Sequence, residues 1–161
     1  PMTPITDTQL IDFIYAEAEL IDTQQLQAWE ALFTDDGHYW MPLTPGQTDP
    51  LLQGSLMYED KMLLKIRVER FFGKRTFSQQ PHTRCHHLLQ APRIIARDHT
   101  AGAYTCRTAF HYVETRQDEQ SLFAGWATHE LVQVDGALRI RLKRVDLLNC
   151  DAALPNIQLF M

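Results

Sequence analysis

One stretch of the sequence, residues 13–42, limits the possible folds more than any other. Its first half continues an apolar repeat at helical spacing, and its second half carries Leu26, Trp29 and Phe33 on one helical face. The spacing predicts two consecutive helices that lead into a short strand at residues 39–41. Such a helix pair cannot bury its apolar stripe alone, so the rest of the chain has to supply a sheet.

Short polar motifs set the expected ends of these helices. Thr6 and Gln9 are three residues apart, as in a capping box, and predict the start of the first helix. Asp22 or Thr23 is expected to cap the second helix, and the polar residues 34–37 are expected to end it.

A third helix is predicted from residue 54 to residue 72, after a loop at residues 43–53. Large apolar and charged residues alternate through this stretch at spacings that suit a helix. Gly73 is placed to end it, and residues 74–81 are expected to form a polar connection.

Beyond residue 82 the apolar residues alternate, which is typical of strands. Alternation predicts three strands over residues 83–97, 103–114 and 122–134, separated by turns at residues 98–102 and 116–121. Pro92 has no N–H for a ladder and predicts a bend or bulge. One face of the second strand is expected to carry Tyr104, Cys106, Thr108, Phe110 and Tyr112.

The end of the chain contains the clearest strand. Residues 134–137, Val-Asp-Gly-Ala, predict a tight hairpin. The alternation that follows changes phase, which predicts a bulge near residues 143–144. Arg139, Arg141 and Lys143 are expected to form the solvent face of this strand.

The order of the elements points to the fold class. Three helices followed by about four long antiparallel strands are typical of an α+β fold, with the helices packed on one face of a strongly curved, mainly antiparallel sheet. A sheet curved in this way leaves a conical hollow, which either forms a pocket or is filled by side chains. The length of 161 residues predicts a single domain, residues 1–161.

Charge and composition exclude some partners. A net charge of −5 argues against nucleic acid as the main partner, because phosphate binding needs a basic surface. No apolar run approaches the length of a membrane span, and the first ten residues do not resemble a signal peptide. The expectation is therefore a cytoplasmic protein, with Cys85, Cys106 and Cys150 as reduced thiols.

A cluster of histidines and a cysteine, His82, Cys85, His86 and His87, raises the question of a metal site. On a strand His86 and His87 point to opposite faces, and His82 and His86 lie too far apart for one ion. Cys85-x-His87 is half of a Rieske iron–sulfur pattern, but its Cys-x-x-His half is missing. Structural or interface histidines are the favoured interpretation.

Acid–base catalysis inside the hollow is the second chemical hypothesis, because a buried Asp–His or Tyr–His pair suits a dehydratase or isomerase. The residues that could line such a cavity are Tyr15, Asp36, His38, Tyr39, His111 and His129. A lone histidine on a sheet more often bonds a neighbouring carbonyl, and the sequence brings no two of these residues together. Phosphate-binding glycine loops and nucleophile elbows are absent from the sequence.

Large apolar groups are frequent on the predicted sheet and at the end of the chain. Each is read either as a core residue or as an anchor of a subunit contact. The set is Phe110, Tyr112, Phe123, Trp126, Ile157, Leu159 and Phe160.

Several motifs together resemble a known family. They are Phe13-x-Tyr15-x-Glu17-Ala18-x-Leu20-x-Asp22, Trp29-x-x-Leu32-Phe33-x-x-Asp36, Tyr39-Trp40-Met41-Pro42, Tyr58-Glu59-Asp60-Lys61, Arg67-Val68-x-Arg70, Arg84-x-x-His87, Pro92-Arg93-Ile94, Lys143-Arg144-Val145-x-Leu147-Leu148 and Leu154-Pro155-Asn156-Ile157. The chain resembles the small (beta) subunit of bacterial aromatic-ring-hydroxylating dioxygenases, which have an NTF2-like (cystatin-like) fold. The Trp-x-x-Leu-Phe piece is common to many NTF2-like proteins, and the Tyr-Trp-x-Pro piece is more specific.

The resemblance implies a non-catalytic structural subunit of an oxidoreductase. In this family the Rieske 2Fe–2S cluster and the mononuclear iron belong to a large alpha subunit, and the beta subunit trimerises within an α3β3 hexamer. No catalytic, cofactor-binding or metal residue carries over to this chain, because the family pattern assigns none.

Two alternatives stay open. A stand-alone NTF2-like dehydratase or isomerase would need an open, polar cone. A small-molecule binding module would need an open apolar cone without an acid–base pair.

Overall fold

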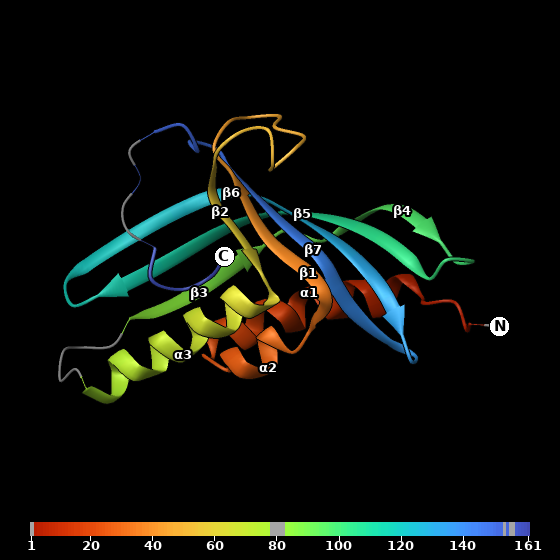
Figure 1. Ribbon diagram of the computed structural model, residues 1–161, viewed down its shortest axis with the longest axis horizontal. Coiled ribbons are helices and arrows are strands. Elements are labelled where there is room, and N and C mark those ends of the chain that lie inside the picture. Colours follow the sequence, from red (N-terminus) through yellow and green to blue (C-terminus); the bar gives the residue numbers. More distant parts are fainter. Residues whose placement is uncertain (1, 78–82, 153, 155–156) are drawn as a thin grey trace.

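The computed structural model describes residues 2–77, 83–152, 154 and 157–161. In these residues three helices lie along one side of a curved, seven-stranded sheet (Figure 1). The strand order is β2-β1-β7-β6-β5-β3, with β4 also paired to β5. The predicted α+β class is confirmed, and every pairing is antiparallel except that of β1 with β7.

Helix α1, Asp7–Asp22, has the predicted capping box. The Thr6 hydroxyl accepts from the Gln9 amide at 3.2 Å, and the Gln9 side chain accepts from the Thr6 amide at 2.8 Å. These bonds satisfy backbone donors that no helical carbonyl can reach, so they fix where the helix begins. The buried face of α1 consists of Leu10, Ile14, Glu17, Ala18 and Ile21.

The second helix is shorter than predicted. Helix α2 is Leu26–Glu30, and Gln25 precedes it without a side-chain cap, so neither Asp22 nor Thr23 caps it. Strand β1, Phe33–Pro42, already begins at Phe33, which was predicted to lie in the helix. The polar residues 34–37 continue this strand because Gly37 lies against the Ile140 carbonyl, where a side chain would not fit. The strand ends at Pro42 as predicted.

The third predicted helix is divided into a strand and a helix. Residues 55–60 form β2, Ser55–Asp60, which pairs with β1. Helix α3, Lys61–Phe77, follows at once, and the Asp60 carboxylate accepts from the Leu63 amide at 2.9 Å as its cap. Gly73 does not end the helix, since α3 continues through it.

Strands β3, Arg84–Leu89, and β4, Arg93–Asp98, pair with the two halves of β5, Ala103–Arg116. Pro92 separates them, which confirms the predicted bend. The residues predicted to share one face of β5 are all buried, so this prediction is confirmed for Tyr104, Cys106, Thr108, Phe110 and Tyr112. The polar turn that follows is shorter than expected, because β5 runs to Arg116 and β6, Glu119–Val134, starts three residues later.

A tight turn joins β6 to β7, Ala137–Leu147, at the predicted place. Asp135 and Gly136 have φ of 51° and 79°, as a type I′ hairpin requires. The predicted bulge exists but lies earlier, because Glu130 pairs with Leu142 and Leu131 with Ile140, which leaves Arg141 as the extra residue. The earlier bulge turns Lys143 inward, so its prediction as a solvent-facing residue is wrong.

The last described residues, 157–161, run back beneath the sheet. In Figure 1 the C-terminal end lies between the sheet and the helices. Phe160 there joins the core with Phe110, Tyr112, Phe123 and Leu159. No helix in the described part of the chain is long and apolar enough to cross a membrane.

Candidate functional site

A buried carboxylate lies in the hollow between α1 and the sheet. Glu17 is only 2% exposed, and its carboxylate accepts from three donors. Trp29 Nε1 on α2 and Lys143 Nζ on β7 each lie 2.8 Å from Oε2, and His129 Nε2 on β6 lies 2.7 Å from Oε1. Helix α1 places Glu17 one turn from Ile14 and Ile21, on its apolar face.

The cluster carries one negative and one positive charge. Burial raises the pKa of Glu17, but Lys143 and the His129 hydrogen bond outweigh it and hold that pKa far below its usual range. Burial lowers the pKa of His129 despite the adjacent carboxylate, so the ring is neutral at pH 7. A neutral ring that donates from Nε2 to Glu17 has an unprotonated Nδ1.

The tail of the chain, residues 157–161, fills the hollow next to this cluster. Phe160 stacks on Trp29 with ring centroids 4.3 Å apart. The Met161 carbonyl accepts from Lys143 Nζ at 2.6 Å, and the Met161 amide donates to Tyr39 Oη at 3.1 Å. The tail therefore lies where a ligand of an open cone would lie.

A second pair of side chains, His87 and Asp22, supports the tail from β3. His87 Nδ1 lies 2.6 Å from Asp22 Oδ1, and His87 Nε2 lies 3.2 Å from the Met161 carbonyl. Both ring nitrogens thus lie beside oxygen atoms, one of the Asp22 carboxylate and one of Met161. The backbone amide of His87 also donates to Asp22 at 2.9 Å, which fixes the strand to the end of α1.

Almost no space remains beside the Glu17 cluster, whereas a cavity of about 450 Å³ lies on the other side of the tail, against α3. The cavity bounded by Glu17, His129, Lys143 and Met161 has a volume of about 10 Å³. That is room for about one water molecule. Two buried polar atoms beside it, Thr108 Oγ1 and His129 Nδ1, have no hydrogen-bond partner among the described residues.

The structure separates the six residues proposed for acid–base chemistry. Tyr39 and His129 reach the interior. Tyr15 is 43% exposed on α1, and His38, which stacks on Tyr58, points to the sheet face opposite to that of Tyr39. The two remaining candidates, Asp36 and His111, are exposed. The predicted cavity lining is therefore wrong for four of the six residues.

Sequence reasoning missed the centre of the cluster. Glu17 had a signal, because residues 10, 14, 17 and 21 follow a seven-residue apolar spacing with one carboxylate at a core position. The sequence signal for Lys143 was weaker. Counted back in steps of two from Leu147 and Val145, Lys143 falls on the same face of the strand as these two apolar residues.

The histidine and cysteine cluster does not suit a metal centre. His87 has Asp22 and Met161 at its ring nitrogens, and burial raises the pKa of the Cys85 thiol to about 12, so the thiol is neutral. His86 is exposed, and His82 lies outside the described residues. Throughout the described ranges no group of three His, Cys, Asp or Glu side chains is arranged to hold a metal ion. A Rieske cluster does not fit these residues.

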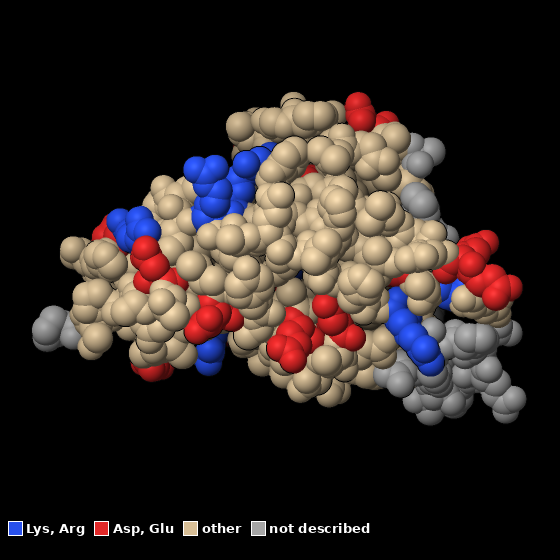
Figure 2. All heavy atoms as spheres, turned by 180° about the vertical axis from the view of Figure 1, so that it is seen from behind, with Lys and Arg blue, Asp and Glu red and all other residues tan. Residues whose placement is uncertain are grey.

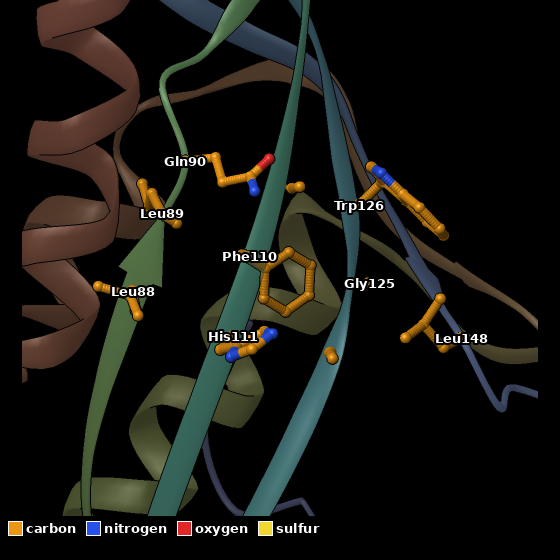
Figure 3. A pocket seen from close by; sticks show the side chains of 10 residues that line it. Leu88, Leu89, Gln90, Phe110, His111, Gly125, Trp126 and Leu148 are labelled. Atoms are coloured by element: carbon orange, nitrogen blue, oxygen red, sulfur yellow. The ribbon is translucent and has the colours of Figure 1, made fainter.

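A second hollow lies on the outer side of the sheet (Figure 3). It has a volume of about 430 Å³ and runs between β3 and β6. Leu88, His111, Trp126 and Leu148 line it with mostly apolar surface. Arg107 lies 4.8 Å from the Trp126 ring, and Leu88 and Leu148 are 66% and 62% exposed.

Charge is unevenly spread over the face seen from behind. Figure 2 shows a group of basic side chains at the upper left and other charged side chains at the top, the two ends and the lower edge of this face, while its middle is uncharged. An uncharged middle with a charged rim resembles the surface composition of subunit contacts.

Comparison with known proteins gives one consistent family. The family described as "Ring hydroxylating beta subunit" matches residues 16–152. The small oxygenase component of the p-cumate 2,3-dioxygenase system of Pseudomonas putida is 32% identical over 154 residues, which cover 94% of this chain and 84% of that protein.

Solved structures agree with the sequence match. The beta subunit of the benzoate 1,2-dioxygenase of Burkholderia mallei superposes with a TM-score of 0.78 at 26% identity, over 92% of this chain and 94% of that one. A putative scytalone dehydratase of Novosphingobium aromaticivorans shares the fold, with a TM-score of 0.61 at 16% identity over 89% of this chain and 88% of that one.

Proposed function

This chain belongs to the beta-subunit family of ring-hydroxylating dioxygenases, and on that premise we propose that it is a non-catalytic assembly subunit of an aromatic-ring-hydroxylating dioxygenase. Residues 1–161 act as one NTF2-like domain that supports a larger alpha subunit. The Rieske 2Fe–2S cluster and the mononuclear iron belong to that alpha subunit, and the assembly is a cytoplasmic α3β3 hexamer built around a trimer of this chain.

One observation carries the proposal: the hollow of the fold is filled by the chain itself. Phe160 stacks on Trp29, and Met161 is bonded through both its amide and its carbonyl. The remaining cavity of about 10 Å³ is far below the roughly 300 Å³ at which small-molecule pockets begin. The space beside the Glu17 cluster is therefore too small for a small-molecule substrate, which favours a role in assembly.

The second hollow, which lies on the outer side of the sheet and is called the outer groove from here on, supports an assembly role. Arginine and tryptophan are enriched among the residues that dominate binding energy. Trp126 lines the groove, and Arg107 lies over its ring. Exposed Leu88 and Leu148 add apolar surface beside them.

A dehydratase or isomerase is the second candidate, and the Glu17–His129 pair is the observation that favours it. Two features oppose it. The Glu17 carboxylate is already occupied by three donors, and the space at His129 Nδ1 does not admit a substrate.

The test is to purify the chain alone and together with a ring-hydroxylating alpha subunit, and to measure iron, acid-labile sulfide and oxygenation. We expect iron, sulfide and turnover only in the complex, with a native mass that fits three copies of each chain. Stoichiometric iron or turnover in the chain alone would overturn the proposal, and a complex without this chain's trimer would overturn its stoichiometry.

A further inference from the structure

The tail is held by side chains and not by a strand or helix. Residues 157–161 belong to no helix or sheet ladder. The Gln158 and Leu159 amides donate to the Glu114 carboxylate at 3.0 and 2.8 Å. The Met161 amide bonds Tyr39. Side chains of the folded domain, and not a sheet ladder, therefore hold the backbone amides of this segment.

The carbonyl end of the tail lies between two nitrogen-bearing side chains from different strands. Lys143 Nζ and His87 Nε2 converge on the Met161 oxygen at 2.6 and 3.2 Å. Each of these side chains is fixed by a carboxylate behind it, Glu17 for Lys143 and Asp22 for His87. Lys143 and His87 are therefore positioned to bind an acyl oxygen at the place where the Met161 oxygen lies.

An aromatic slot gives the site its side-chain preference. Phe160 is 5% exposed, lies flat on Trp29 and meets the edge of the Tyr39 ring at 5.7 Å. The Trp29 indole is itself fixed by its bond to Glu17. Gln158, by contrast, has an exposed side chain, so only part of the sequence is selected.

We infer that the hollow is a binding site for a short peptide with an aromatic side chain, and that residues 158–161 occupy it as a ligand joined to the same chain. Glu114 and Tyr39 recognise its amides, Lys143 and His87 recognise its acyl oxygen, and Trp29 receives its ring. A peptide of the same sequence then binds in trans once the tail is cut from the domain. The inference is independent of the assembly role.

The experiment cuts the tail after the full chain has folded. A protease recognition sequence is inserted between Asp151 and Ala152, both exposed, and the purified chain is cleaved. We expect the fragment of residues 152–161 to stay bound through gel filtration, and a fluorescently labelled synthetic peptide of the same sequence to exchange with it. If the domain unfolds when the fragment leaves, added peptide is expected to restore it and to raise its Tm with concentration.

Matched peptides test the recognition. A peptide with Phe160→Ala is expected to bind roughly 100-fold more weakly, because it leaves the aromatic slot empty. A peptide with Gln158→Ala is expected to bind within about twofold of the original, since that side chain is exposed. In the protein, Glu114→Gln is expected to weaken binding about tenfold, whereas Glu119→Gln, an exposed residue, is expected not to change it.

Three results would overturn the inference. One is a cleaved domain that binds no labelled peptide and is not restored by an excess of it. Another is equal binding of the original and Phe160→Ala peptides. The third is a Glu114→Gln domain that binds the peptide as well as the unchanged domain does.

Discussion

Lys143 tolerates burial because two of its three donors meet fixed acceptors. Its ammonium group bonds Glu17 and the Met161 carbonyl inside the core. Replacing one member of such a pair leaves the other charge buried without its counter-ion, and this loss exceeds the value of the pair itself. The effect of a substitution here is therefore much larger than on the surface.

Lys143→Met is expected to lower the free energy of unfolding by about 3–5 kcal/mol, because Glu17 then remains ionised without its cation. Lys65→Met is the matched control, since Lys65 is exposed on α3, and a change within about 0.5 kcal/mol is expected. Urea unfolding of both variants measures the difference. Equal, small losses would show that the cluster does not hold the core.

The lowered pKa of Glu17 makes stability depend on acid pH. The unfolded chain binds the proton more tightly, so the contribution of Glu17 is complete above its ordinary pKa of 4.5 and is lost as the pH falls below that value. The wild-type protein is expected to lose stability steeply below this pH. Glu17→Gln is expected to be less stable at pH 7 and to lose less on acidification. Denaturant titrations across this range would contradict the account if the two slopes agreed.

The two unpaired atoms beside the cavity define a place for water. His129 Nδ1 is an acceptor, and the Thr108 hydroxyl can both donate and accept. We expect a high-resolution crystal structure to show one ordered water that contacts both atoms, and Thr108→Val to remove it. Thr128→Val, a half-buried position on the adjacent strand, is the control that leaves the water in place.

Among the elements, close backbone contacts decide where side chains are allowed. Gly125 in β6 approaches the backbone of Asp146 in β7 so closely that a Cβ would overlap the Asp146 carbonyl. Gly73 in α3 has no atom within 4 Å of the place where a Cβ would lie. The same substitution is therefore expected to have opposite effects at the two positions.

Gly125→Ala is expected to cost about 3 kcal/mol, because the two central strands have to move apart. Gly73→Ala is expected to stabilise the protein by about 0.5–1 kcal/mol through helix propensity. Thermal unfolding of the two variants measures both signs. A neutral Gly125→Ala would mean that β6 and β7 do not approach as described.

Local patterns explain which elements could be predicted. The capping box of α1, the Pro92 bend and the Asp135–Gly136 turn are set by neighbouring residues, and all three predictions are confirmed. Strand β2 was predicted as helix because its pairing with β1 is invisible in its own sequence, which also fits helical spacing. The strand that pairs with such a segment determines its secondary structure more than its intrinsic propensity does.

The cluster in the hollow could not be predicted for a similar reason. Glu17 is 112 residues from His129 and 126 from Lys143, so only the folded sheet brings them together. The position of one bulge decides whether Lys143 faces solvent or core. The family resemblance, by contrast, used motifs spread along the whole chain, and the match over residues 16–152 confirms it.

At the scale of the whole molecule, the fold combines an interior that its own side chains occupy with an apolar groove on its outer surface. The helices, the sheet and the tail pack against one another in the interior, for example where Phe160 stacks on Trp29. The groove that contains Trp126 and Leu148 stays open on the outside. Both features support the proposed assembly role.

The most direct test of this account is the oxygenation rate of the assembled complex with His129→Gln in the beta subunit, normalised to the amount of complex that forms. If the interior is structural, the rate per complex stays within about twofold of the unchanged complex, although less complex is expected to form. A fall of 100-fold or more in complexes of normal mass and iron content is what loss of a general base produces. That result would contradict the account.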